Sequence, residues 1–236
     1  MGLGNRMGNS KAVHIISISW GIREDIPSIS TALNQALKAG ILIFASASNT
    51  GANYPITFPA RLQGIFCIGS ADGLGAPSTF NPPYEGEEKY STLGEAVLGA
   101  CPRNLSDQAG YIAETQTIRR DGTSTATPIA AGIAALFVDY TWQFVDGNAA
   151  WTYENIRKLF SRMSQATFGK DYRYIVPWSL FESGREFQII IKNILSAPLG
   201  MTLFREATQY ANDFQSRINI GLLRVSWVQV QVKPLD

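Results

Sequence analysis

Residues 122–128 read Gly122-Thr123-Ser124-Thr125-Ala126-Thr127-Pro128, and a run of small and apolar residues, Ile129–Tyr140, follows them. We predict that Ser124 opens a helix and that the flexible Gly122 leads into it. The first turn of a helix carries unpaired backbone N–H groups and a partial positive charge, which favour an anion beside the serine. We expect Pro128 in this first turn, where a missing N–H costs little. The pattern indicates a nucleophile, although a serine here can also be a simple N-cap.

Short apolar runs before this segment predict a parallel sheet. Val13–Ser19 and Ile41–Ala45 are typical of buried strands. Between them, Ser28–Ala39 has apolar residues at helical spacing, with Ser28 as the expected N-cap and Gly40 as the C-terminal stop. A strand–helix–strand order implies a right-handed crossover between parallel strands. Further along the chain we predict two more strands, Ile65–Ser70 and Glu95–Cys101. Between them we predict a surface loop, Asp72–Tyr90, and after them a helix, Trp151–Ser164.

The composition indicates one α/β domain with a C-terminal extension. We expect the domain to occupy residues 1–181 and the extension residues 182–236. Within the extension, Arg185–Ile191 and the alternating Val228–Val232 predict strands, and Thr202–Ile218 predicts a helix. No pattern in the extension indicates a function.

Charge and cysteine content narrow the classes of function. The net charge is +1 with no basic cluster, which argues against nucleic acid or an anionic membrane surface as a partner. The sequence contains no run of 18 apolar residues, so we predict no membrane-spanning segment. The first eleven residues form no signal peptide and two cysteines form no disulfide framework, which together favour a cytoplasmic location. A single histidine with Cys67 and Cys101 makes no typical zinc site, so we predict no metal, and Cys67 lies in an apolar run typical of a buried, inert thiol.

Polar residues follow the predicted strands at the edge where open α/β sheets bind ligands. The first strand is followed by Ser19-Trp20-Gly21, and the second by Ala47-Ser48-Asn49. The side-chain amide of Asn49 is a donor suited to an oxyanion. The alternative is that Asn49 only shapes a turn before Gly51.

In this order, these segments resemble the subtilisin-like serine peptidases, the subtilase or peptidase S8 family. Residues 122–128 match the family's nucleophile motif Gly-Thr-Ser-x-Ala-Thr/Ser-Pro, Asn49 falls on its oxyanion-hole asparagine, and Ser19–Gly21 falls on its Ser-x-Gly strand. Three further matches are Phe58-Pro59-Ala60, Gly69-Ser70-Ala71-Asp72 and Tyr90-Ser91-Thr92-Leu93-Gly94. Tyr172-Arg173-Tyr174 and Pro177-Trp178 resemble fungal intracellular members.

The resemblance implies a three-layer α/β sandwich with a mostly parallel sheet and an endopeptidase that acts on peptide or protein substrates. Ser124 would be the nucleophile, and Asn49 with the Ser124 N–H would form the oxyanion hole. The implied substrate contacts are Ser19, Trp20, Gly21, Ala47, Ser48, Gly122 and Thr123. Ser48 stands where the family has a glycine, which predicts a narrower or more polar specificity pocket. The reaction needs no cofactor; calcium stabilises many members, but no acidic cluster here indicates a calcium site.

The family's catalytic aspartate and histidine, which precede the serine, have no counterpart here. The one histidine, His14, lacks the His-Gly-Thr context, so we expect a structural role, and Glu24 and Asp25 are expected in solvent. We therefore expect the C-terminal part of a catalytic domain without its N-terminal strands, beginning at an internal methionine and inactive in isolation. The alternative is a catalytically dead domain that binds peptides or a partner protein. A different α/β hydrolase would show Gly-x-Ser-x-Gly and a later histidine, and neither is present.

Overall fold

The computed structural model describes residues 13–83, 89–105, 107–144, 152–166 and 172–180. The strands and the helix that we predicted within residues 182–236 lie outside this part of the chain. The described strands and helices, in chain order, are β1 (Ile15–Ile18), α1 (Pro27–Lys38), β2 (Leu42–Ser46), β3 (Phe66–Ala71), β4 (Tyr90–Leu93), β5 (Val97–Ala100), β6 (Tyr111–Ile112), β7 (Thr117–Arg120), α2 (Thr123–Phe144), α3 (Tyr153–Met163), β8 (Ser164–Ala166) and β9 (Arg173–Ile175).

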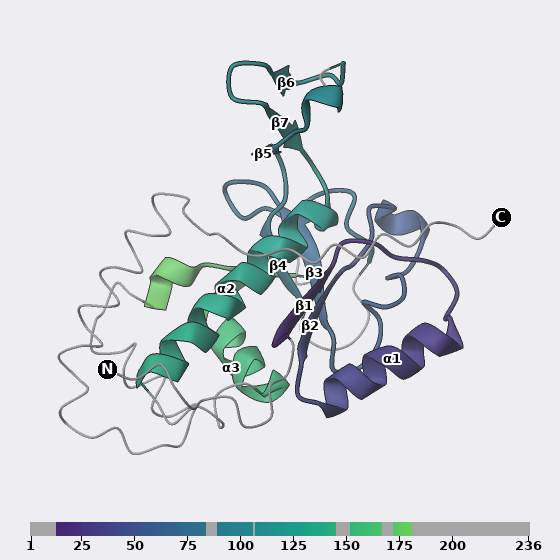
Figure 1. Cartoon of the computed structure of the whole chain (residues 1–236), viewed down its shortest axis with the longest axis vertical. Helices are drawn as coiled ribbons and strands as arrows, with labels where there is room; N and C mark the ends of the chain where they lie inside the picture. The colour runs from purple at the N-terminus through teal and green to yellow at the C-terminus, as the bar shows by residue number, and fades with distance from the viewer. Residues whose placement is uncertain (1–12, 84–88, 106, 145–151, 167–171, 181–236) are drawn as a thin grey trace.

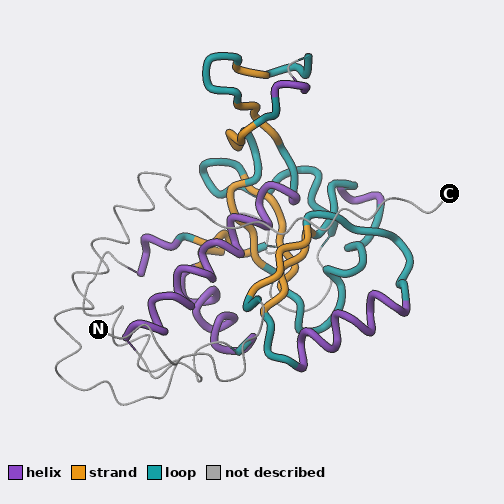
Figure 2. Tube along the Cα trace, in the orientation of Figure 1, coloured by secondary structure: helices purple, strands orange, loops and turns teal. Residues whose placement is uncertain are grey.

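Within the described residues, the main sheet has six strands in the order β1-β2-β3-β4-β9-β8. Figure 2 draws the strands of the protein in orange. Each neighbouring pair from β1 to β9 is parallel, and only β8 runs antiparallel to β9. This confirms the predicted α/β class and the mostly parallel sheet. Because the strands from β1 to β4 run the same way, their carboxyl ends meet at one edge of the sheet.

Helices cover both faces of this sheet, which gives three layers (Figure 1). Residues of β2 alternate between the two faces, as a strand period of two requires. Phe44 points toward α2 and α3, where it stacks on Phe66 with ring centroids 4.7 Å apart, and Phe160 of α3 packs against both rings. Ile43 points to the opposite face and packs in the cluster that contains Leu33 of α1. No helix in the described part of the chain is both long and apolar enough to cross a membrane.

The start of α1 differs from the prediction. The N-cap is Ile26 and not Ser28, and no side chain caps the helix. The reason is Pro27, which occupies the first helical position, where its fixed φ suits the helix and its missing N–H needs no partner. The predicted stop is confirmed: the helix ends at Lys38 with Ala39 as C-cap, and Gly40 adopts a φ of +71°.

Two strands depart from the prediction between residues 72 and 101. The predicted surface loop Asp72–Tyr90 runs into β4, a central strand in which the buried Thr92 Oγ1 donates to the carbonyl of Ala126, 2.7 Å away. The predicted strand 95–101 exists as β5, but it belongs to a separate antiparallel sheet, β5-β7-β6. Figure 1 shows this small sheet projecting from the body of the protein. Its two ends connect β4 to α2.

Candidate active site

Ser124 lies at the carboxyl end of β1. The helix α2 begins at Thr123, so Ser124 is in its first turn, as predicted. Ser124 Oγ donates a hydrogen bond to the carbonyl of Ser19 at 3.0 Å, and Ser19 Oγ donates to the carbonyl of Ser124 at 2.8 Å. Two predicted site residues that are 105 positions apart are therefore joined by a reciprocal pair of hydrogen bonds.

The position of Pro128 corrects one expectation. Pro128 is the sixth residue of α2 and not part of its first turn. In a regular helix the N–H of residue 128 would donate to the carbonyl of Ser124, four residues earlier. Proline has no N–H, so the carbonyl of the candidate nucleophile lacks its ordinary helical donor.

Asn49 lies just after β2 and is exposed, but hydrogen bonds fix the orientation of its side-chain amide. Its Oδ1 accepts hydrogen bonds from both the backbone N–H and the hydroxyl of Thr123, at 2.9 and 3.0 Å. An N–H can face only an acceptor, so the amide oxygen has to point at Thr123 and Nδ2 has to point elsewhere. Nδ2 lies beside Gly122: a Cβ added to Gly122 would stand 3.0 Å from it. Gly122 also has a φ of +146°, so close approach and backbone conformation both require glycine here.

Three of the predicted substrate contacts have their side chains or backbone groups engaged within the protein. Thr123 is 1% exposed, and its hydroxyl faces Asn49. Ala47 is fully buried, its N–H donates to the carbonyl of Ile68 and its carbonyl accepts from Thr57. Trp20 is half-buried and packs on the cluster beneath α1.

The remaining predicted contacts lie at the two strand ends. Gly21 is exposed, and a Cβ there would come within 2.0 Å of Thr57 Oγ1, so a close approach explains the glycine. Ser48 has a φ of +145°, which is unusual for a residue with a side chain, and its hydroxyl lies 3.0 Å from the hydroxyl of Thr50. The structure therefore brings Ser19, Ser48, Asn49 and Ser124 to one edge of the sheet.

The segment that leads from Gly122 into α2 is also supported by β4, which the sequence does not predict. Gly122 N–H donates to the carbonyl of Gly94 at 2.8 Å, just past the end of β4. The Thr125 hydroxyl lies within hydrogen-bonding distance of the Gly94 carbonyl at 3.1 Å and the Gly122 carbonyl at 2.7 Å. The acceptor in each case is a backbone carbonyl, which every residue has, so no pattern of residue types predicts these contacts.

No carboxylate or imidazole of the described residues is hydrogen-bonded to Ser124. His14 precedes β1, and Ser19 is five positions further along the extended chain, or about 16 Å away. It therefore lies at the far end of the strand from Ser124. Glu24 and Asp25 are exposed, as expected, and Asp25 forms an ion pair with Arg61.

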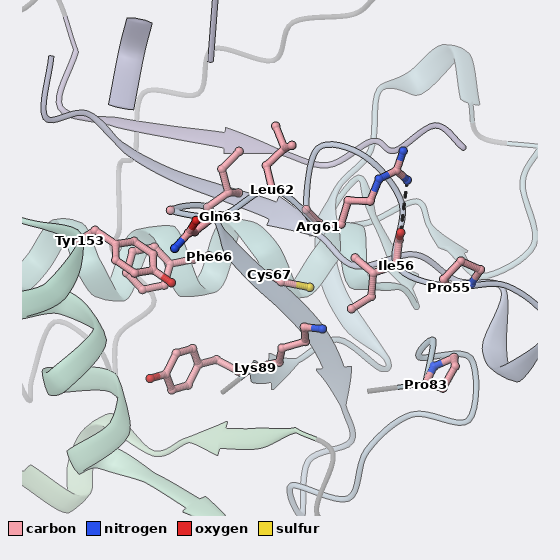
Figure 3. Close-up of a pocket in the computed structure, with 14 residues that line it drawn as sticks. Pro55, Ile56, Arg61, Leu62, Gln63, Phe66, Cys67, Pro83, Lys89 and Tyr153 are labelled. Atoms are coloured by element: carbon pink, nitrogen blue, oxygen red, sulfur yellow. Dashed lines mark hydrogen bonds between the residues drawn. The ribbon is translucent and has the colours of Figure 1, made fainter. Parts of the chain in front are cut away.

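A cavity of about 560 Å³ lies elsewhere, around the amino ends of β3 and β4 (Figure 3). Its lining includes Cys67, Arg61 and Lys89. Burial raises the pKa of the Cys67 thiol from 9.0 to about 12, and the charge of Lys89 opposes this only in part. The thiol is therefore protonated at neutral pH and inert as a nucleophile, as predicted. In the described part of the chain, no group of three or more His, Cys, Asp and Glu side chains is arranged to hold a metal ion.

Comparison with known proteins identifies the class. The model of the subtilase family matches residues 4–174, and the chain belongs to this family. The match falls within the predicted domain 1–181, although the boundary at residue 181 stays a prediction.

Individual relatives are proteases that are longer than this chain. A thermostable alkaline protease of Halalkalibacterium halodurans is 32% identical over 124 residues, which cover 52% of this chain and 31% of the relative. The subtilisin-like protease het-Q2 of Podospora anserina is 30% identical over 146 residues, which cover 58% of this chain and 37% of the relative. The chain thus spans about a third of the length of these relatives.

Solved structures share the fold. The prenylagaramide maturation protease PagA has a TM-score of 0.55 and 22% identity, with 83% of this chain and 62% of that chain covered. The PatG macrocyclase in complex with peptide has a TM-score of 0.58 and 20% identity, with 78% and 52% covered. At these identities the likeness shows the fold alone, and it agrees with the predicted subtilisin-like sandwich.

Proposed function

We propose that this chain carries the serine and the oxyanion hole of a subtilisin-like endopeptidase, with Ser124 as nucleophile. The observation that carries the proposal is the fixed orientation of Asn49 beside the start of α2. Thr123 binds the amide oxygen, so the donor end of Asn49 is available to an anion at Ser124. Membership of the subtilase family supports peptides or proteins as substrates.

In the proposed reaction, Ser124 Oγ attacks the carbonyl carbon of the scissile peptide bond. The carbonyl oxygen becomes an oxyanion, which accepts hydrogen bonds from Asn49 Nδ2 and from the backbone N–H of Ser124. The C–N bond then breaks, the amine leaves with a proton, and water hydrolyses the acyl-enzyme. The backbone of Ser19–Gly21 would pair with the substrate as an added strand, with Ser48 beside it. No cofactor enters any of these steps.

The proton on Ser124 Oγ needs a base, and within the described residues no carboxylate or imidazole is hydrogen-bonded to this hydroxyl. The Ser19 carbonyl, to which the hydroxyl now donates, is not basic enough to take the proton. Loss of the histidine from such a site reduces the rate by about 10⁶, a magnitude that comes from subtilisin itself. We therefore propose that the 236-residue chain alone does not hydrolyse peptides at a useful rate.

A fluorophosphonate probe tests this proposal with imidazole as an external base. Phosphonylation forms a bond from Ser124 Oγ to phosphorus, breaks the P–F bond and transfers the serine proton to imidazole. We expect little labelling of the full chain without imidazole and labelling at Ser124, read by intact mass and peptide mapping, with it. Ser124→Ala is the control. Stoichiometric labelling without imidazole would contradict the proposed inactivity, and no labelling with imidazole would contradict the proposed nucleophile.

The second candidate function is a domain that binds peptides or a partner protein at the same cleft. One observation favours it: the Ser124 hydroxyl donates its hydrogen bond to a backbone carbonyl and not to a base. Binding of peptides by the Ser124→Ala variant with the same affinity as the parent, together with no imidazole-dependent labelling of the parent, would select this reading. Asp-Thr/Ser-Gly and His-Gly-Thr motifs encoded upstream of Met1 would select the endopeptidase.

A further inference from the structure

Because Pro128 has no N–H, the backbone carbonyl of the candidate nucleophile needs a hydrogen-bond donor from elsewhere. Buried or partly buried backbone carbonyls are almost always hydrogen-bonded in folded proteins. The carbonyl of Ser124 has lost its ordinary donor within α2, because residue 128 is a proline. A donor from outside the helix is therefore valuable at this one position.

Ser19 provides that donor. Its hydroxyl lies 2.8 Å from the Ser124 carbonyl oxygen, and Ser19 directly follows β1, which belongs to a different layer of the fold. The other hydroxyls of the same turn have acceptors elsewhere: Thr127 Oγ1 donates to the carbonyl of Thr123, and Thr125 Oγ1 donates to the carbonyl of Gly122 or of Gly94. In the described part of the chain, Ser19 is the side chain that reaches the Ser124 carbonyl.

A second hydrogen bond, in the opposite direction, also joins the two serines. Ser124 Oγ donates to the Ser19 carbonyl at 3.0 Å, so side chain and backbone of each serine engage the other. Two bonds in this arrangement fix both the distance between β1 and α2 and the rotation of the first turn. Among the described strands β1 stands at one edge of the sheet, and Asn49 lies just beyond the carboxyl end of its partner β2.

We propose that Ser19 is a positioning residue for Ser124, because its hydroxyl replaces the helical donor that Pro128 removes. The proposal rests on the proposed function, since it assigns Ser19 a role in placing the nucleophile against Asn49. It gives the side chain of Ser19 a task separate from any pairing of its backbone with a substrate. It also explains how a proline is accommodated four residues after the nucleophile.

The test is a cycle of variants of the full 236-residue chain. Ser19→Ala removes the hydroxyl, Pro128→Ala restores the helical N–H, and the double variant combines them. The matched control is Thr92→Val, which removes a more deeply buried hydroxyl that donates to the Ala126 carbonyl of the same helix. Thermal unfolding of each variant reports its stability.

The first readout is the rate of imidazole-supported phosphonylation of Ser124. We expect Ser19→Ala to lower this rate about tenfold, the scale of one lost hydrogen bond at a positioned group. The double variant should recover to within about twofold of Pro128→Ala, whereas Thr92→Val loses stability without losing rate. Equal slowing in Ser19→Ala and the double variant would overturn the proposal, as would slowing that follows stability in every variant, because a purely structural role predicts that result.

The second readout does not depend on reactivity. The ¹³C chemical shift of the Ser124 carbonyl responds to its hydrogen bonding, so it should move in Ser19→Ala and return toward the parent value in the double variant. If the parent is not phosphonylated with imidazole, the proposed function fails, and this shift alone decides the inference. A Ser124 carbonyl shift that is unchanged in Ser19→Ala overturns it.

Discussion

Ser124 at the carboxyl edge of the sheet and Cys67 beside the cavity at the amino ends of β3 and β4 present opposite settings for a nucleophile. Cys67 has the more nucleophilic atom and lines a cavity of about 560 Å³. Ser124 has the weaker atom, but an oriented amide and a helix N-terminus surround it. The cavity nevertheless holds an inert thiol, because burial favours the neutral form.

The difference teaches that the polar groups around an atom decide its chemistry more than its intrinsic reactivity or the space beside it. Donors that face a developing negative charge stabilise it, whereas an apolar wall destabilises it. Each prediction below changes one side of this comparison.

The largest expected effect concerns the thiol. At pH 8 a thiol with a pKa of about 12 contains about 10³-fold less thiolate than one at 9.0, and the thiolate is the form that reacts. Iodoacetamide should therefore alkylate Cys67 at least about 10³-fold more slowly in the native chain than in the unfolded chain. Peptide mapping separates Cys67 from Cys101. Similar rates in both states would mean that Cys67 is neither buried nor perturbed.

The same shift predicts a dependence of stability on pH. The pKa of Cys67 is higher in the folded state than in the unfolded state, so its contribution is complete below pH 9 and is lost as the pH rises from 9 toward 12. The slope can reach about 1.4 kcal/mol per pH unit. Because lysines and tyrosines titrate in the same range, the measurement is the difference in urea unfolding between the parent and Cys67→Ala. Equal slopes for the two proteins would contradict the assignment.

The next effect concerns the amide of Asn49. Removal of one oxyanion donor lowers rates by about 10²–10³, a value from an enzyme of this same family. We therefore expect Asn49→Leu to slow imidazole-supported phosphonylation of Ser124 to that extent. Asn81→Leu is the control, because Asn81 also bonds backbone groups through both ends of its amide, but they are those of Ser70 and not those of Thr123. Equal slowing by both substitutions would indicate a general loss of structure.

Much of this contrast was predictable from the sequence. The apolar run around Cys67 predicted a buried strand and an inert thiol, and the order of residues 13–45 predicted β1, α1 and β2. The segment 122–128 predicted the start of a helix, and Asn49 was predicted beside it. These features are local, or they follow from strand ends meeting at one edge of a parallel sheet.

What the sequence did not predict depends on contacts between distant segments. No strand was predicted at β4: the predicted loop ends at Tyr90, the first residue of this strand, and the acceptor that Thr92 finds on α2 is distant in the sequence. The short strands β8 and β9 were not predicted, since a pairing of three residues leaves no periodic pattern. The roles of Thr123 and Ser19 also depend on partners 74 and 105 residues away.

A smaller effect is expected where the site requires glycine. An alanine at Gly122 would combine a φ of +146° with a Cβ 3.0 Å from Asn49 Nδ2. We expect Gly122→Ala to lower the free energy of unfolding by about 1–3 kcal/mol and to slow phosphonylation of Ser124. The matched control is Gly99→Ala on β5, where an added Cβ meets no atom within 4 Å. Equal stability of the two variants would contradict the close packing of Gly122 against Asn49.

The smallest effect distinguishes the backbones of the two regions. The cavity lining contains one left-handed residue, Gly64, for which that conformation is unstrained, whereas the site contains Ser48 at a φ of +145°. At ordinary positions alanine is more stabilising than glycine by roughly 0.5–1 kcal/mol. At residue 48 the order should invert, because Ser48→Ala keeps the strained conformation and loses the hydrogen bond to Thr50, while Ser48→Gly loses the bond but relieves the strain.

We expect Ser48→Gly to be more stable than Ser48→Ala by about 1 kcal/mol in urea unfolding, since relief of strain of order 1–3 kcal/mol exceeds the entropic cost of glycine. The same pair of substitutions at Ser30, in the body of α1, provides the ordinary order for comparison. If alanine is the more stable residue at both positions, the backbone at Ser48 is unstrained. The inverted order would instead place stored strain next to Asn49, on the reactive side of the comparison and not beside the inert thiol.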